Sequence, residues 1–226
     1  MSPLKGLFFV MQFQLRTIVL ITSFLPGIVL AQKQSLITFG PSANSYRGEL
    51  SDYTNWSGGI QAGWIFDVNK KLSGSLQAGF ATASGSDRNF ALQLNSSDPD
   101  INTFVKTNFL FINYALRFTF LRKEGISAYL SQGVGFMRFS PNDEFGDNLI
   151  DQDNTRAPNE NYRNISFMLP TGLGATYLLG NGFGVNLEIS LLNITSDYFD
   201  NISEFGENGS DNILSTRLLL LVPFNR

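Results

Sequence analysis

The stretch FLFINYALRFTFL, residues 109–121, alternates apolar side chains with others at a period of two residues. Every even position from 110 to 120 is apolar, whereas Asn113, Arg117 and Thr119 stand among the odd positions. Successive side chains of an extended strand point to opposite faces of a sheet. The stretch therefore predicts a strand with one apolar face and one polar face.

The same alternation recurs along the chain, in LSGSLQAGF (residues 72–80), FGVNLEISLL (183–192) and ILSTRLLLLVPF (213–224). From residue 32 onward no stretch approaches 18 apolar residues and few show helical spacing, so the chain is predicted to be all-β. We expect eight strands, near residues 36–46, 58–67, 72–84, 104–121, 126–139, 165–179, 183–194 and 212–224. Glycines interrupt the alternation in the fifth of these strands, so the pattern does not show which of its faces is apolar.

The N-terminal segment predicts export. Arg16 precedes an apolar stretch, residues 17–30, that is too short to span a bilayer, and small residues at the recognition positions predict cleavage after Ala31. We therefore assign residues 1–31 to a cleaved signal peptide, with Met11 a plausible true start, and residues 32–226 to one domain. Cleavage would leave 14 basic and 19 acidic residues, a net charge of 14 − 19 = −5. Nucleic acid is a poor partner for so acidic a protein.

The expected connections differ in length in an ordered way. Residues 68–71, 122–125 and 180–182 form tight turns, whereas residues 85–103, 141–162 and 195–211 form long polar segments. Short turns at one end and long loops at the other, with an even number of strands, are typical of bacterial outer-membrane barrels. The sequence thus predicts an eight-stranded antiparallel up-and-down transmembrane β-barrel with short periplasmic turns and long extracellular loops.

Alternation alone does not distinguish this barrel from a soluble one that turns its apolar face inward. The charges favour the membrane, because 14 of the 19 acidic residues lie in the three long segments and the polar strand faces carry mainly small neutral residues. Lipid would then cover the apolar face. Seven aromatic residues at the short-turn ends are expected to form an interfacial girdle: Trp64, Phe66, Phe118, Phe120, Tyr177, Phe183 and Phe224.

Composition also narrows the chemistry. The chain has no histidine and no cysteine, which excludes disulfides, thiol chemistry, histidine-based triads and histidine-ligated metals. We predict no enzyme activity, no cofactor, no metal site and no catalytic residue. The loop acids Asp143, Glu144 and Asp147 could hold calcium weakly, but a solvated loop explains them better.

Arg217 lies on the polar face of the last strand and, inside a narrow barrel, needs a partner. Pairing the last two strands around residues 195–211 brings Glu188 roughly opposite it, and Arg117 could approach across the lumen. Two interpretations remain: a gate that opens a pore, and a static ion pair in a plugged barrel. Side chains fill the interior of an eight-stranded barrel, which favours the static pair.

Two stretches carry a more specific resemblance. NSYRGELS (residues 44–51) and LPTGLGATYLLGNGFGVNLEISLLNITSDYFDNIS (169–203) resemble conserved segments of a family of small outer-membrane barrels that includes the PorG-type component of the type IX secretion system. The family pattern reads Tyr-x-Gly-Asp-Leu, then Pro-x-Gly-x-Gly and Thr-Asp-Tyr-Leu-Asp-Asp-Val-Ser, and the departures are Glu49, Ser196, Phe199, Asn201 and Ile202. The matching positions are Tyr46, Gly48, Leu50, Pro170, Gly172, Gly174, Glu188, Asp197, Tyr198, Asp200 and Ser203.

The resemblance implies a non-enzymatic outer-membrane component of a secretion or envelope complex. The alternative is a free-standing surface barrel whose acidic loops mediate adhesion or ligand binding. A porin-like channel is disfavoured by the narrow interior. In the loop TSDYFDNIS, the residues Asp197, Tyr198, Phe199 and Asp200 could serve recognition or could equally pack the loop onto the barrel rim.

Overall fold

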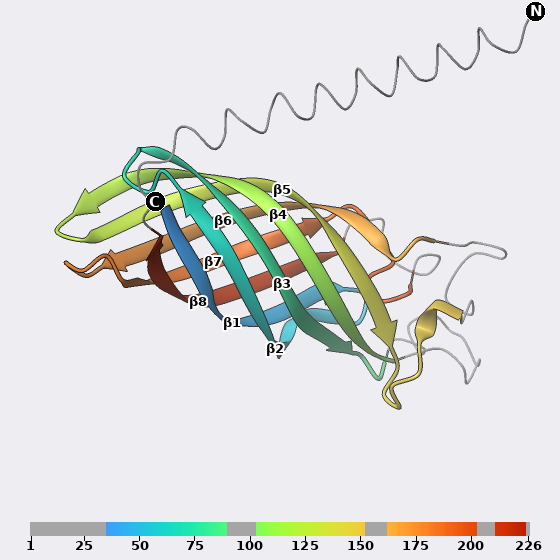
Figure 1. Cartoon of the computed structure of the whole chain (residues 1–226). Coiled ribbons are helices and arrows are strands. Elements are labelled where there is room, and N and C mark those ends of the chain that lie inside the picture. The colour runs from blue at the N-terminus through green and yellow to red at the C-terminus, as the bar shows by residue number, and fades with distance from the viewer. Residues whose placement is uncertain (1–34, 90–102, 152–161, 203–210, 225–226) are drawn as a thin grey trace, which may run out of the picture.

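The alternating stretches form a closed antiparallel barrel in the computed structural model, which describes residues 35–89, 103–151, 162–202 and 211–224 (Figure 1). Neighbours around the ring are consecutive in sequence, and β1 pairs with β8 to close it. The strands are β1 (Ser35–Gly48), β2 (Ser51–Phe66), β3 (Leu72–Ser86), β4 (Phe104–Lys123), β5 (Ile126–Asn142), β6 (Ile165–Leu178), β7 (Gly184–Ile194) and β8 (Asn212–Phe224). The predicted eight-stranded up-and-down barrel is confirmed.

Helix is almost absent from these ranges. One short 3-10 element, η1 (Leu149–Asp151), follows β5. Among the described residues no helix is long and apolar enough to cross a membrane. The predicted signal peptide and its cleavage after Ala31 lie outside the described residues, and they remain predictions.

The three predicted short turns lie together at one end of the barrel (Figure 1). Between β4 and β5 only Glu124 and Gly125 are left, with φ angles of 47° and 84°. Positive φ at both central residues defines the two-residue hairpin turn whose twist matches that of the flanking strands, and glycine adopts it without strain. Local turn chemistry therefore accounts for this end of the barrel.

The first connection at the opposite end differs from the prediction. Strand β2 begins at Ser51, seven residues before the expected residue 58, and only Glu49 and Leu50 separate it from β1. This end therefore holds one tight turn beside the three longer connections. Residues 51–57 are mostly polar, so their strand carries no apolar alternation from which its start could be predicted.

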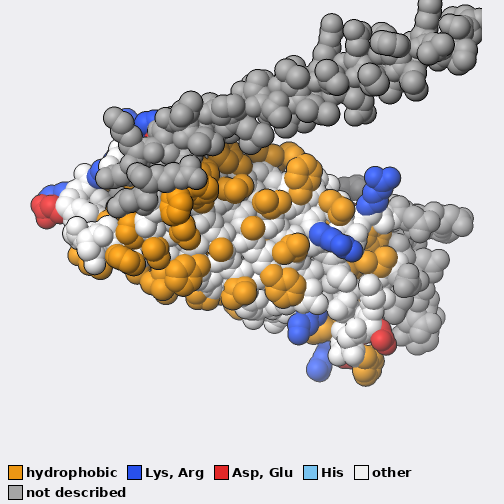
Figure 2. Space-filling model, viewed as in Figure 1, with side chains coloured by type: hydrophobic (Ala, Val, Ile, Leu, Met, Phe, Trp, Pro, Cys, Tyr) orange, Lys and Arg blue, Asp and Glu red, His pale blue; other side chains and the backbone are white. Residues whose placement is uncertain are grey.

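The outer surface of the barrel is apolar. On β4 the even positions from Leu110 to Phe120 are exposed, whereas Phe109, Phe111, Asn113 and Arg117 are buried inside. Hydrophobic side chains cover the body of the barrel in Figure 2, and charged side chains lie mostly near its ends. The apolar face thus points outward and the polar face points into the lumen, as the charge distribution predicted.

The seven predicted girdle aromatics lie at the short-turn end. Phe118, Phe120, Tyr177 and Phe183 are exposed there. Trp64 packs against Phe66 and Phe224, with ring centroids 4.9 and 5.4 Å apart, which leaves these three rings half-buried. These three rings lie on β2 and β8, the two strands that flank β1, and so they mark the place where β1 and β8 close the barrel.

The lumen is filled in three levels. At the loop end lies an apolar cluster, called the plug below, of Tyr46, Leu50, Ala81, Ala83, Val105, Phe109, Phe111, Met137, Phe139, Leu149, Met168, Leu192, Ile194, Phe199, Ile202 and Ile213. In the middle lies a polar layer of Gln61, Gln77, Asn113, Arg117, Tyr129, Ser131, Thr176, Asn186, Glu188 and Arg217. At the turn end, Leu36, Ile65 and Leu221 form a second apolar cluster with Val68 and Leu178 packed against it.

Candidate functional site

The polar layer contains the predicted ion pair. Glu188 on β7 and Arg217 on β8 are direct partners in the strand register, and both side chains point into the lumen. Arg217 Nη1 lies 3.6 Å from Glu188 Oε1, and the two side chains are 1% and 5% exposed. The structure therefore brings these two residues together as the strand pairing suggested.

The carboxylate of Glu188 has two further neighbours on β5. The Tyr129 hydroxyl lies 2.9 Å from Glu188 Oε2, and the Ser131 hydroxyl lies 3.4 Å from Oε1. Two glycines of β6 make room for these contacts: a Cβ at Gly172 would lie 2.9 Å from Glu188 Oε1, and one at Gly174 would lie 2.3 Å from the Tyr129 ring. The Pro-x-Gly-x-Gly pattern thus has a steric basis, because larger residues would occupy the space of the polar layer.

Arg117 joins this layer from the other side of the lumen. Its guanidinium lies over the Tyr129 ring, 3.6 Å from the centroid, a cation–π arrangement. Its Nη2 donates to Thr176 Oγ1 at 3.2 Å and to Asn186 Oδ1 at 3.3 Å. Arg117 is therefore linked to the ion pair through Tyr129 and Asn186.

Arg217 reaches across the barrel to β3 and β4. Its Nη1 donates to Gln77 Oε1 at 2.6 Å, and its guanidinium carbon lies 5.9 Å from the centroid of the Phe111 ring. Sequence reasoning placed Gln77 and Asn186 on polar faces but assigned them no role. It missed Tyr129 because the glycines of β5 hid the alternation there; only the strand register could have predicted its position.

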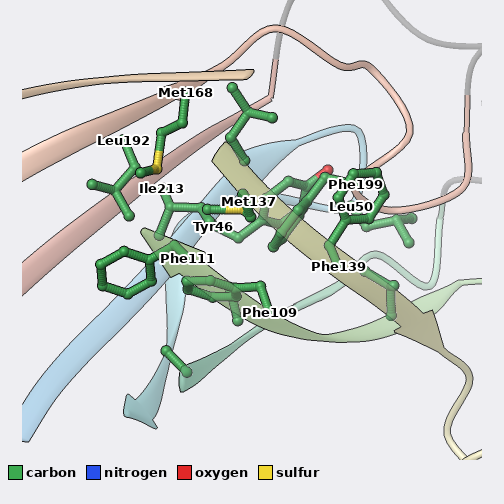
Figure 3. Packing of buried hydrophobic residues seen from close by; sticks show 14 of the residues in the cluster. Tyr46, Leu50, Phe109, Phe111, Met137, Phe139, Met168, Leu192, Phe199 and Ile213 are labelled. Atoms are coloured by element: carbon green, nitrogen blue, oxygen red, sulfur yellow. The ribbon is translucent and has the colours of Figure 1, made fainter. Parts of the chain in front are cut away.

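The plug closes the lumen above this layer (Figure 3). Part of it comes from the connection between β7 and β8, because Phe199 and Ile202 lie among the strand residues of the cluster. The Phe199 ring lies 5.4 Å from Tyr46, 5.8 Å from Phe109 and 5.8 Å from Phe139. Thr107 Oγ1 also donates to the Phe199 carbonyl at 2.6 Å. This connection therefore folds into the mouth of the barrel.

The four loop residues considered for recognition fall into two groups. Phe199 and Asp200 are 1% and 0% exposed, so neither side chain is presented to an external partner. Both residues pack the loop against the barrel, which was the alternative to recognition that the sequence left open. Tyr198 is half-buried and stacks on Tyr162, with ring centroids 4.4 Å apart, and Asp197 is also half-buried.

A group of three carboxylates, Glu49, Asp200 and Asp211, surrounds the Tyr46 hydroxyl at the mouth. Their oxygens lie within 4.8 Å of one another. The Tyr46 hydroxyl lies 2.5 Å from Asp200 Oδ2 and 3.2 Å from Asp211 Oδ1. The two stretches that resemble the small-barrel family therefore meet here, since Tyr46 and Glu49 belong to one and Asp200 to the other. Sequence reasoning missed this contact because 154 positions separate Tyr46 from Asp200.

Burial changes the acidity of this carboxylate group. Desolvation, followed by repulsion from Asp211, raises the pKa of Asp200 to about 8. Desolvation, followed by repulsion from Asp200, raises the pKa of Glu49 to about 8, and burial also raises the pKa of Asp211. Carboxyl groups with raised pKa values can share protons near neutral pH, and the Tyr46 hydroxyl is within hydrogen-bond distance of two of the three carboxylates.

The fold is that of small outer-membrane β-barrels. Solved structures that resemble the chain include Neisserial surface protein A (11% identity, 82% of this chain and 96% of that one, TM-score 0.51), the attachment invasion locus protein Ail of Yersinia pestis in complex with a heparin analogue (10%, 85% and 99%, TM-score 0.50), and OprG of Pseudomonas aeruginosa (9%, 87% and 98%, TM-score 0.50). At such low identity the likeness concerns the fold alone. No protein-family model and no curated protein matches the sequence.

Proposed function

We propose that the protein is an integral bacterial outer-membrane barrel that acts without catalysis as a structural or accessory component of a secretion or envelope complex. The apolar outer face supports insertion into lipid, because a surface of this kind would be unfavourable in water. The resemblance of residues 44–51 and 169–203 to the small-barrel family that includes the PorG-type component supports the role in a complex.

The observation that carries this proposal is the filled lumen. The plug, the polar layer and the turn-end cluster occupy successive levels of the interior. A filled interior argues against free diffusion of solutes through the barrel. The surfaces on which the protein would act are then its outer wall and its two ends.

One feature of the loop end favours protein contact. Residues 143–147 form an ordered turn in which Asp143 Oδ1 accepts hydrogen bonds from the Phe145 and Asp147 amides at 2.9 and 2.8 Å. The turn presents Phe145 with 83% of its surface exposed, between the acidic residues Glu144 and Asp147. An exposed aromatic ring on a fixed turn suits a partner with an apolar pocket and basic surroundings.

The same turn would also serve the alternative function, a free-standing surface barrel that captures a ligand or mediates adhesion. The two functions differ in what a deletion strain loses. A component of a secretion complex would leave exported cargo behind in the cell, whereas an adhesin would leave secretion intact and lose surface binding.

The test combines this deletion with affinity purification of the tagged protein from solubilised outer membranes. We expect envelope proteins to co-purify, and Phe145→Ala to reduce their recovery while barrel abundance stays normal. Leu179→Ala is the matched control, because Leu179 is an exposed apolar side chain in the opposite, short-turn end. Normal secretion together with an absence of co-purifying envelope proteins would reject the role in a complex.

A further inference from the structure

The polar layer contains buried groups that lack partners. Arg217 Nη2, both polar atoms of the Gln61 amide and both polar atoms of the Asn113 amide have no hydrogen-bond partner among the described residues. The three residues are 1%, 6% and 2% exposed. Buried polar groups in native proteins nearly always find partners, so the three unpartnered donors, Arg217 Nη2 and the two amide nitrogens, call for an explanation.

These groups lie near Gln77 and Phe111, at the border between the polar layer and the plug. Gln77, which accepts from Arg217, is the register partner of Asn113 on the adjacent strand. Gln61 is the register partner of Gly79, and a Cβ at Gly79 would lie 2.8 Å from Gln61 Cβ and 2.7 Å from the Phe111 ring. The Arg217 guanidinium faces that same ring. Gln61 Cβ and the Phe111 ring therefore both lie beside Gly79, whose lack of a side chain leaves room for them.

The charges of the layer do not balance. Two guanidinium groups, Arg117 and Arg217, face one carboxylate, Glu188, which leaves a net charge of 2 − 1 = +1 among the described residues of the layer. The nearest other buried acids, Asp200 and Asp211, belong to the mouth, where burial raises the pKa of both. An uncompensated charge in the interior is strongly unfavourable, so this layer favours a ligand of negative charge.

We propose that the polar layer binds one small monovalent anion of the chloride class, held by Arg217 Nη2 and the amide N–H groups of Gln61 and Asn113. A single negative charge would neutralise the layer, and all three ligands donate hydrogen bonds. A divalent oxyanion such as sulfate would exceed the available charge. Apolar clusters above and below the layer exclude bulk water, which strengthens the electrostatic attraction.

The first experiment compares the stability of the full-length barrel refolded into lipid vesicles with chloride or with gluconate, a larger organic anion, at the same ionic strength. Chloride should raise the free energy of unfolding in proportion to the logarithm of its concentration c once c exceeds the dissociation constant Kd, because a ligand that binds only the folded state stabilises it by RT ln(1 + c/Kd). In Gln61→Leu, which keeps every charge, the chloride dissociation constant obtained from this dependence should rise by about tenfold, the loss expected for one hydrogen bond to a charged ligand.

Gln132→Leu is the matched control, because Gln132 is an exposed glutamine on the outer face of β5 and should leave the chloride dependence unchanged. The second experiment is diffraction from crystals grown in bromide, in which the anomalous signal should place bromide within hydrogen-bond distance of Arg217. This measurement uses the unaltered protein, so it tests for the bound anion even if the Gln61 variant fails to fold. Equal stability in chloride and gluconate, or bromide found only on the outer surface, would overturn the proposal.

Discussion

The plug and the polar layer fill neighbouring levels of one barrel by different means. The plug buries apolar side chains, and each side chain gains mainly by leaving water. The polar layer buries two arginines and a glutamate, which are tolerated only because Tyr129, Gln77 and Asn186 surround them. We therefore expect substitutions in the plug to act one side chain at a time, whereas those in the polar layer should be coupled to one another.

The strongest test of this difference is Glu188→Gln. It leaves both arginines without a carboxylate, and we expect a loss of about 3–5 kcal/mol in the free energy of unfolding, the cost of breaking a buried ion pair. Adding Arg217→Met should restore part of that loss. Urea unfolding in lipid vesicles measures both variants. Additive losses would show that the two residues are not coupled. A large rise in single-channel conductance after Glu188→Gln would instead support the interpretation that the ion pair gates a pore.

Phe199→Ala tests the plug. The change removes a buried ring that contacts Tyr46, Phe109 and Phe139, and it should lower the free energy of unfolding by about 3 kcal/mol, near the lower end for buried phenylalanine. Phe145→Ala, at an exposed phenylalanine, should change it by less than about 0.5 kcal/mol. If Phe199→Ala instead leaves stability unchanged and reduces co-purification of partners, the loop serves recognition.

The carboxylate group at the mouth should make the loop contact sensitive to pH. Because the pKa of Asp200 is raised when folded, the folded state binds more protons than the unfolded state between about pH 4 and pH 8. Its contribution to stability is full below about pH 4 and is lost as the pH rises to about 8, by no more than about 1.4 kcal/mol per pH unit. Amide hydrogen exchange of residues 199–202 measures this loss, and Asp200→Asn should flatten it. Slower exchange at higher pH, after correction for intrinsic rates, would contradict the assignment.

Ser131 provides the mildest test of coupling within the polar layer. Ser131→Ala removes a 3.4 Å contact to Glu188, and it should cost about 0.5–1 kcal/mol in the unaltered protein. In the Glu188→Gln background the same change should cost almost nothing, because the charged acceptor is gone. Equal costs in both backgrounds would mean that the polar layer is no more coupled than the plug.

The sequence predicted the β4, β7 and β8 strands closely because their alternation continues across the apolar belt. It also placed Glu188 roughly opposite Arg217, because the two strands are antiparallel neighbours and both side chains lie on the polar face, which restricts the register to steps of two residues. It misjudged the start of β2, where the strand extends beyond the apolar belt and its outer face carries polar residues. It did not predict which face of β5 is apolar, because glycines that leave room for other side chains interrupt the alternation there.

What the sequence alone determined is therefore the barrel: its eight strands, the three tight turns at one end, and the apolar face of each strand whose alternation is clear. These features follow from the two-residue period of a strand and from local turn chemistry. Only the tertiary structure decided how the lumen is filled. Tyr46 with Asp200, Arg117 with Tyr129 and Arg217 with Gln77 are contacts across the closed ring. Such contacts depend on barrel closure and on how a loop folds inward, and no local pattern in the sequence encodes either.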